Sequence, residues 1–150
     1  MVINLVHRIP VASRRPQCHN ALMTALISPK DVIRILEEIG VLLELKGESP
    51  FKSIAYANAA RRLETLDEDL EVLARRGDLK SVKGIGDALS KKITELVTTG
   101  RLEYYEKLKA SIPPGHLEML RIPGLGPKKI RALYEKLAIE TLGELEYACM

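Results

Sequence analysis

The chain has 150 residues and a formal net charge of +3, and 46% of its residues are hydrophobic but only 4% aromatic. A core poor in aromatic side chains must be built from Leu, Ile, Val and Ala, which favours helices over β-sandwiches. Because no apolar stretch reaches the roughly 18–20 residues of a membrane helix, we expect no membrane association. The two cysteines, Cys18 and Cys149, lack the spacing of a zinc site or a disulfide framework and indicate a reducing cytoplasm.

Residues 1–27 carry Arg8, Arg14 and Arg15 but no acidic residue, so they account for the whole net charge. They show no sustained periodicity, which predicts a disordered or non-native N-terminal extension, with Met23 as an alternative start. A basic arm and an arginine-rich targeting segment are the alternative interpretations. Because the rest of the chain is electrically neutral, attraction to nucleic acid must come from local basic patches.

From Ser28 onward the sequence predicts successive helices. Ser28 has the chemistry of an N-cap, and Pro29 suits the first helical position. This helix ends near residues 46–49, and a second begins near residues 49–51. A third covers residues 67–77, with acidic residues in its first turn and glycine as its stop. The apolar stripes are Val32, Leu36, Ile39 and Leu43 in the first helix and Phe51, Ile54, Ala55, Ala59 and Leu63 in the second.

Shorter helices follow in the second half of the chain. They are predicted at residues 87–98, 101–110, 114–120, 127–138 and from Thr141, which pairs with Glu144 in a capping box. No segment alternates with period two, so we predict an all-α fold, a small helical bundle. The last helix begins with a cap but has no C-cap signal, which predicts that the chain is the front part of a longer protein.

Residues 82–97 and 122–137, called here the first and second hairpin, are two copies of one pattern. In each copy a Gly-apolar-Gly turn leads directly into a helix with an apolar stripe. Glycine tolerates positive φ angles and lets a phosphate approach the backbone, while the helix N-terminus offers free N–H groups. The apolar residue between the glycines can plug into the core. The alternative is a pair of ordinary helix–helix turns. The turn residues are Gly84, Ile85 and Gly86 in the first hairpin and Gly124, Leu125 and Gly126 in the second.

This arrangement is the helix-hairpin-helix pattern, which contacts the DNA backbone without reading base sequence. Residues 121–136 contain five basic residues against one acidic residue, Glu135. We expect such a face to neutralise phosphates and to bind more weakly as the salt concentration rises. The predicted DNA contacts on the two helices are Lys91, Lys128, Lys129 and Arg131.

Lys92 is a candidate nucleophile in the first hairpin. It lies at the edge of the apolar stripe of its helix, where the second hairpin has Ala132. Partial burial and crowding by like charge favour the neutral amine, the form that attacks a carbonyl to give a Schiff base. The alternative is a lysine whose stem covers the edge of the core. The lysines expected to crowd it are Lys80, Lys83 and Lys91.

Three stretches resemble the N-terminal region of bacterial family X DNA polymerases, a family that includes eukaryotic DNA polymerase beta. They read SPFKSIAYANAARRLETL, VKGIGDALSKKITELVTTGRLEYYEKL and SIPPGHLEMLRIPGLGPKKIRALYEKL. The resemblance runs from about Ser28 to the end of the chain. It implies a polymerase beta N-terminal-like lyase-type domain over residues 28–108 with the first hairpin. A truncated fingers subdomain with the second hairpin follows over residues 109–150.

The resemblance also implies roles for single residues. Lys92 matches the lysine that forms a Schiff base with the sugar of a 5′-deoxyribose phosphate, whose release follows by β-elimination. Lys52 and Tyr56 match residues near the 5′-phosphate. Basic residues common in the family are replaced here by Ala57, Asn58 and Ala88.

The resemblance bears on two kinds of cation, the Mg²⁺ ions of the polymerase active site and a monovalent ion at the hairpins. The Mg²⁺ ions of a polymerase palm need closely spaced aspartates on a strand, and this sequence has none, so we expect no polymerase or exonuclease site here. The family's hairpins hold a monovalent cation, Na⁺ or K⁺, on backbone carbonyls. The matching carbonyls belong to Lys80, Val82 and Ile85 and to Leu120, Ile122 and Leu125.

The sequence therefore predicts a monomeric DNA-binding protein of the bacterial cytoplasm and nucleoid. Its expected ligand is gapped, nicked or duplex DNA, and its expected process is base excision repair, with lyase activity through Lys92. A non-catalytic helix-hairpin-helix DNA-binding module and a helical protein-interaction module are the alternatives. Salt-sensitive binding to DNA of arbitrary sequence separates the protein-interaction module from the other two.

Overall fold

The computed structural model describes residues 27–150, so the predictions for residues 1–26, including Cys18 and the N-terminal arginines, lie outside the described residues. Every regular element in this range is helical, which confirms the all-α prediction. No helix within residues 27–150 is long and apolar enough to cross a membrane. The elements are α1 (Pro29–Lys46), α2 (Pro50–Glu64), α3 (Leu70–Arg76), the 3-10 helix η2 (Asp78–Ser81), α4 (Asp87–Thr99), α5 (Glu103–Ala110), α6 (Pro114–Met119), α7 (Pro127–Leu137) and α8 (Leu142–Ala148).

Helix α1 is the central element of the bundle. The Ser28 hydroxyl accepts a hydrogen bond from the Asp31 N–H at 3.2 Å, so the predicted N-cap is confirmed. Gly47 ends the helix in the left-handed conformation, with φ of +76°, and donates its N–H to the Glu44 carbonyl. The predicted stripe of Val32, Leu36, Ile39 and Leu43 is buried, with each side chain at most 1% exposed.

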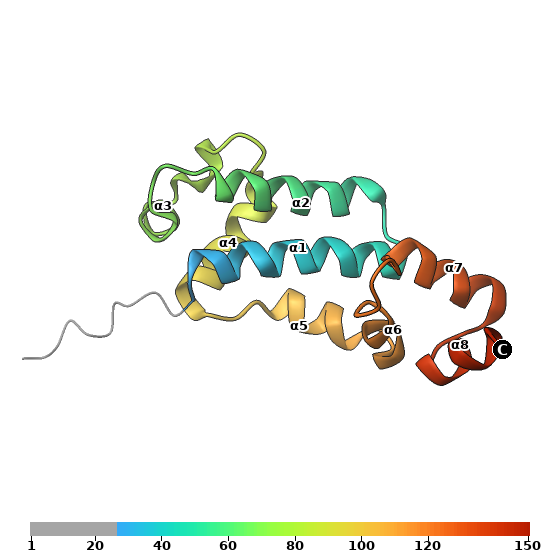
Figure 1. Ribbon diagram of the computed structural model, residues 1–150. Coiled ribbons are helices and arrows are strands. Elements are labelled where there is room, and N and C mark those ends of the chain that lie inside the picture. Colours follow the sequence, from blue (N-terminus) through green and yellow to red (C-terminus); the bar gives the residue numbers. More distant parts are fainter. Residues whose placement is uncertain (1–26) are drawn as a thin grey trace, which may run out of the picture.

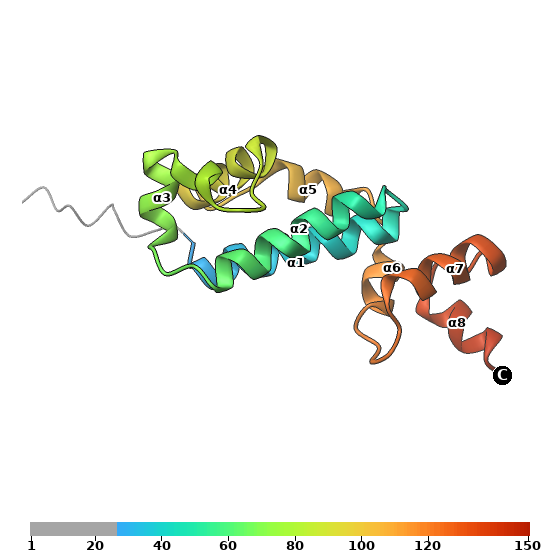
Figure 2. The ribbon, with the colours of Figure 1, turned by 90° about the horizontal axis from the view of Figure 1, so that it is seen from above.

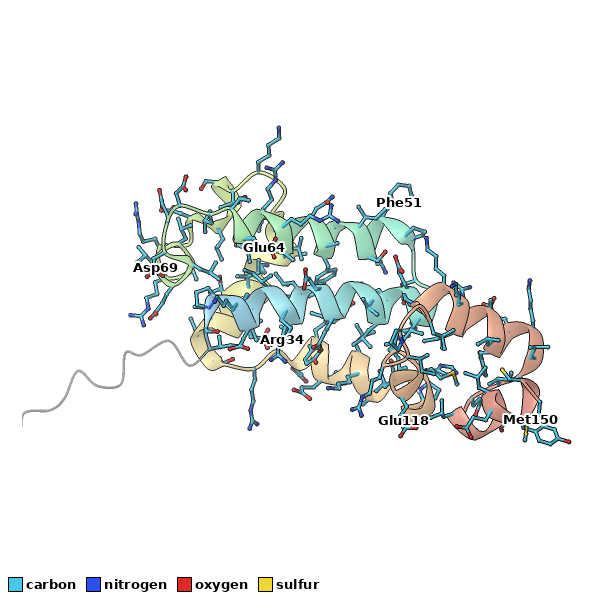
Figure 3. The ribbon with its side chains drawn as sticks, in the orientation of Figure 1. Arg34, Phe51, Glu64, Asp69, Glu118 and Met150 are labelled. Atoms are coloured by element: carbon cyan, nitrogen blue, oxygen red, sulfur yellow. The ribbon has the colours of Figure 1, made fainter. Side chains whose placement is uncertain are left out.

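Helix α2 packs antiparallel to α1 through a different face from the one predicted. Phe51 is 83% exposed and Ile54 is 52% exposed, so the prediction that they belong to the buried stripe of this helix was wrong. Phe51 points away from α1 at the beginning of α2 (Figure 3). Small residues instead let the backbones approach, since a methyl group on Gly40 would lie 3.2 Å from the Ser53 carbonyl oxygen. The buried residues of α2 are Ser53, Tyr56, Ala59, Ala60 and Leu63.

The local signals of the other helices agree with the sequence. The Asp69 carboxylate caps α3 by accepting from the Glu71 N–H, and Gly77 ends that helix with φ of +75°. Thr141 and Glu144 form both hydrogen bonds of the predicted capping box at the start of α8. Turn chemistry therefore sets where these short helices begin and end, because each has too few residues to be stable alone.

The helices form one bundle with an extension at one end. Helix α1 runs between α2 and α5, with α4 behind, and α6, α7 and α8 lie beyond the loop that joins α1 to α2 (Figures 1 and 2). Helix α7 contacts α1, and α6 contacts α8. Gly115 of α6 lies directly against the chain that leads into α8, since a methyl group on Gly115 would lie 2.0 Å from the Glu140 carbonyl oxygen. The predicted domain boundary after residue 108 falls in the last turn of α5 and stays a prediction.

Candidate nucleic-acid interface and lysine site

The turn of the first hairpin joins η2 to α4. Gly84 has φ of +96°, in the left-handed region, whereas Gly86 is extended, with φ of −81° and ψ of 175°, and is the N-cap of α4. Only the first glycine needs the conformational freedom of glycine. Between them Ile85 is 4% exposed, and its N–H donates to the Val82 carbonyl at 3.0 Å. The expected plug into the core is therefore confirmed for this residue.

The turn of the second hairpin joins α6 to α7 with nearly the same backbone. Gly124 has φ of +83°, and Gly126 has φ of −80° and ψ of 169°. The Leu125 N–H donates to the Ile122 carbonyl at 3.1 Å, as in the first hairpin. Leu125 is only half-buried, although it still packs against the core. The sequence repeat is thus a structural repeat, with a looser plug in the second copy.

The N-termini of α4 and α7 are open. Neither helix has a side-chain hydrogen bond to its first N–H groups, since the N-cap of each is glycine. A methyl group built on Gly86 or Gly126 would have no heavy atom of the described residues within 4 Å, apart from its chain neighbours. Unpaired N–H groups at the positive end of a helix dipole, with no side chain in front of them, suit an anion such as a phosphate.

The charges around the two helix N-termini differ. In the first hairpin Asp87 is the first residue of α4, and its carboxylate lies 2.7 Å from the Lys80 Nζ. The hydrogen bond from Lys80 holds the pKa of Asp87 below its usual value, so this site carries its own anion at neutral pH. The second hairpin has Pro127 at the matching position and no carboxylate there.

Four basic side chains on α4 and α7 were predicted as DNA contacts. Lys91 and Lys128 are exposed and form no ion pair with a described residue. The Lys129 Nζ donates to the Gly124 carbonyl at 2.9 Å, so it lies over the turn of the second hairpin. These positions leave a cationic surface at the start of α7.

Arg131 lies in a different environment. Its guanidinium occupies the space beside Gly47, where a methyl group would meet it at 2.6 Å, and its Nε donates to the Glu135 carboxylate at 2.6 Å. The C-terminal end of α1 carries a partial negative charge, which a guanidinium stabilises. Arg131 therefore holds α7 against α1, a structural role that the sequence did not predict.

Lys92 lies in a half-buried site between three helices. Its Nζ donates to the Tyr56 hydroxyl of α2 at 2.5 Å and lies 3.5 Å from the centre of the Tyr104 ring of α5. The two tyrosine rings are stacked nearly parallel, with centres 6.3 Å apart. The structure thus brings Lys92 together with Tyr56, which the resemblance matched to a residue near the 5′-phosphate, and Tyr104 adds a cation–π contact. Tyr104 was missed, because nothing in its sequence neighbourhood shows that α5 turns this ring toward α4.

The surroundings of Lys92 increase the share of its neutral form. Burial lowers the pKa of Lys92, the ammonium of Lys52 lowers it further, and Glu95 acts in the opposite direction. The sequence predicted crowding by other lysines, and that choice of residues was wrong. Lys80 is bound to Asp87, and the repelling charge comes from Lys52, whose Nζ lies 2.9 Å from the Glu48 carboxylate.

The tyrosine that accepts the hydrogen bond from Lys92 keeps its own proton. Tyr56 is 6% exposed, and burial, followed by the effect of Tyr104, raises the pKa of its hydroxyl well above the usual value. A neutral phenol can accept from the Lys92 ammonium or donate to the free amine. Tyr56 can therefore orient the amine in either protonation state.

The backbone carbonyls proposed for a monovalent cation have free acceptor capacity. The Val82 and Ile122 carbonyls each accept one N–H and retain a second lone pair. Among the described residues, no hydrogen bond is donated to the other four carbonyls. Carbonyl oxygens are the donors that Na⁺ and K⁺ prefer, so the residues fit such an ion. The four belong to Lys80, Ile85, Leu120 and Leu125.

Comparison with known proteins adds family information. Residues 28–102 match the family described as helix-hairpin-helix domain, and residues 117–149 match the SAM-like helix-hairpin-helix tandem. The chain is 40% identical over 120 residues to the "DNA polymerase/3'-5' exonuclease PolX" of Bacillus subtilis (strain 168). That alignment covers 80% of this chain and 20% of the relative, so the chain spans about a fifth of the relative's length.

Proposed function

The chain belongs to the helix-hairpin-helix domain family and is similar to a bacterial family X polymerase, and on this basis we propose that it binds the backbone of DNA. The observation that carries the proposal is the repeated turn. Both hairpins present the N-terminus of a helix behind two glycines, with no side chain in front of it. Such a site contacts phosphates and not base edges, so binding is independent of base sequence.

The preferred ligand in this proposal is gapped or nicked DNA with a 5′-phosphate, as it occurs in base excision repair. The first hairpin and Lys52 lie near the Lys92 site and would bind the 5′-phosphate side. The basic start of α7, with Lys128 and Lys129, would bind the neighbouring duplex backbone. We propose that the protein acts as a monomer in the cytoplasm, on DNA of the nucleoid.

We further propose that Lys92 acts as a 5′-deoxyribose-phosphate lyase. The neutral amine attacks the C1′ aldehyde of the open sugar, and loss of water gives an imine. Loss of the C2′ proton then breaks the C3′–O bond, which leaves the DNA strand with a 5′-phosphate. Hydrolysis of the imine releases the sugar phosphate and returns the amine. The lowered pKa of Lys92 and its hydrogen bond to Tyr56 support this role.

A monovalent cation would support the hairpins in this proposal. Na⁺ or K⁺ would bind the carbonyls of each turn, where it adds positive charge beside a phosphate. The chain's own contribution is the turn geometry, which is repeated in the Ile85 and Leu125 hydrogen bonds at 3.0 and 3.1 Å. Mg²⁺ has no proposed role within these residues.

Borohydride trapping tests the lyase proposal. The substrate is gapped DNA with a 5′-deoxyribose phosphate, and the proteins are the wild type, Lys92→Ala and the control Lys107→Ala, which lies outside every proposed DNA contact. We expect a covalent adduct with the wild type and with Lys107→Ala, and none with Lys92→Ala, which should still bind the DNA. An adduct that persists in Lys92→Ala would contradict the assignment of Lys92.

A non-catalytic DNA-binding module is the second candidate function. Ala88, which is exposed one turn before Lys92, favours it because the family commonly has a basic residue there. If no protein forms the adduct while all bind gapped DNA in a salt-dependent way, the binding module is the function. If the wild type binds no DNA, the helical protein-interaction module replaces both proposals.

A further inference from the structure

A cationic pocket lies beside the turn of the first hairpin, outside the Lys92 site. It has a volume of about 490 Å³ and is open to solvent between the C-terminal half of α2 and the segment that leads into α4. That segment passes close to α2 in the upper part of Figure 1. No residue of this pocket contacts Lys92 in the hydrogen bonds or ring contacts described above. The pocket is lined by Asn58, Arg61, Arg62, Thr65, Lys83 and Gly84.

The lining carries positive charge that no acid of the described chain neutralises. Arg61, Arg62 and Lys83 form no ion pair with a described residue, and the pocket lining includes no carboxylate. Two other surface lysines near the first hairpin are paired, Lys80 with Asp87 and Lys52 with Glu48. Three unpaired cations that share one concave surface repel each other, so a bound anion would relieve that repulsion.

The donors of the pocket select an oxyanion as the ligand. Two guanidinium groups, one ammonium and the amide of Asn58 supply only N–H donors toward the pocket, apart from the single amide oxygen. The Thr65 hydroxyl uses its proton on the Arg62 carbonyl at 3.2 Å. A cation would be repelled by the three basic side chains, whereas guanidinium forks match the geometry of phosphate oxygens.

The position of Arg62 joins the pocket to the hairpin. Its Cγ lies 3.8 Å from the place of a methyl group on Gly84, the glycine that turns the backbone with φ of +96°. A phosphate in the pocket would therefore lie on the outer side of the same turn that leads into α4, whose first residue is Asp87. Arg61 also borders a neighbouring groove with Glu37 and Glu44, so Arg62 and Lys83 are the residues most specific to the pocket.

We propose that this cationic pocket binds a backbone phosphate of the DNA strand that passes the first hairpin. The inference rests on the proposed DNA binding and adds a contact site to it. In this arrangement the strand is held on α2 and on the outer side of the turn, and the Lys92 site remains free for a sugar. The volume admits a phosphate with the sugar attached to it.

The test compares two variants that lose the same charges. Arg62→Gln/Lys83→Gln removes one arginine and one lysine from the pocket, and Arg101→Gln/Lys107→Gln removes one of each from a surface outside every proposed contact. Affinity for gapped DNA is measured by fluorescence anisotropy over a range of salt concentrations. We expect about a tenfold loss of affinity for the pocket variant and a salt slope reduced by about one to two. The control should lose much less.

The outcomes separate this proposal from the proposed function. Equal losses in the two variants mean a net-charge effect and overturn the pocket, while DNA binding by the wild type keeps the proposed function. No binding by the wild type overturns both. If the double variant fails to fold, Lys83→Gln repeats the test, because Lys83 is exposed in a turn. If a nucleoside triphosphate without DNA protects Lys83 from acetylation and gapped DNA does not, the ligand is a free nucleotide and the strand assignment is overturned.

Discussion

The two hairpins share a backbone and differ in chemistry. Their first glycines have φ of +96° and +83°, and both second glycines are extended N-caps. Yet the first hairpin has an acid at the start of its helix, a fully inserted plug and a half-buried lysine, whereas the second has proline, a half-buried plug and alanine. The comparison teaches that glycine spacing determines the backbone of the turn, while neighbouring side chains determine its charge and its burial.

The largest predicted effect is on stability, when the apolar residue between the two glycines of each turn is replaced by alanine. Ile85 is 4% exposed, so Ile85→Ala would leave a cavity in the core and cost about 2–4 kcal/mol of unfolding free energy. Leu125 is half-buried, and Leu125→Ala should cost about 1–2 kcal/mol, because less apolar surface is lost. Urea denaturation followed by circular dichroism measures both values. Equal losses of unfolding free energy would mean that the difference in burial between Ile85 and Leu125 does not affect stability.

Exchanging the first helical residue should shift DNA binding from one hairpin to the other. Asp87→Asn removes the resident anion from the N-terminus of α4 and should tighten binding to gapped DNA by about two- to fivefold. Pro127→Asp places an anion at the N-terminus of α7 and should weaken binding by a similar factor. Anisotropy titrations at fixed low salt measure both effects.

A matched control keeps this exchange specific to the hairpin. Asp78→Asn removes another exposed aspartate that is paired with a cation, Arg76, but Asp78 lies at the N-terminus of neither α4 nor α7. Its affinity should change less than that of Asp87→Asn. If both aspartate variants gain equally, net charge explains the gain and the proposed competition between Asp87 and phosphate is refuted.

Much of this architecture could be predicted because the signals are local. Ser28, Gly77 and Thr141 act within one helical turn of their own position, so the helix ends followed from capping chemistry. The face of α2 could not be predicted in this way. Its apolar pattern included Phe51 and Ile54, but helix packing favoured the small residues that fit against Gly40. Hydrophobic spacing identifies a helix more reliably than it identifies the buried side of one rich in alanine.

In the candidate site, too, the local features could be predicted and the contacts between helices could not. The edge position of Lys92 followed from helical spacing within α4. The resemblance matched Tyr56 to a residue near the 5′-phosphate, but its hydrogen bond with Lys92 was not predicted. Tyr104 and the charge of Lys52 lie on other helices, and their distance from Lys92 depends on how three helices pack. Long-range electrostatics of this kind has no signature in residue spacing, which is why the wrong lysines were expected to crowd Lys92.

The smallest predicted effect tests the charge of Lys52, which acts from α2 on the half-buried Lys92 of the first hairpin. Lys52→Gln removes a positive charge that lowers the pKa of Lys92, so that pKa should rise toward the ordinary value of a lysine. At a given pH less neutral amine is then present, and reductive methylation of Lys92 should shift to higher pH. Mass spectrometry of peptides after formaldehyde and borohydride treatment measures this without DNA.

Lys107→Gln is the matched control, because Lys107 pairs with Glu103 four residues away just as Lys52 pairs with Glu48. The shift should shrink in high salt, since Lys52 is exposed to solvent. If the pH profile of Lys92 methylation stays unchanged or moves to lower pH, the charge of Lys52 does not lower the pKa of Lys92. Burial would then be the cause of the lowered pKa.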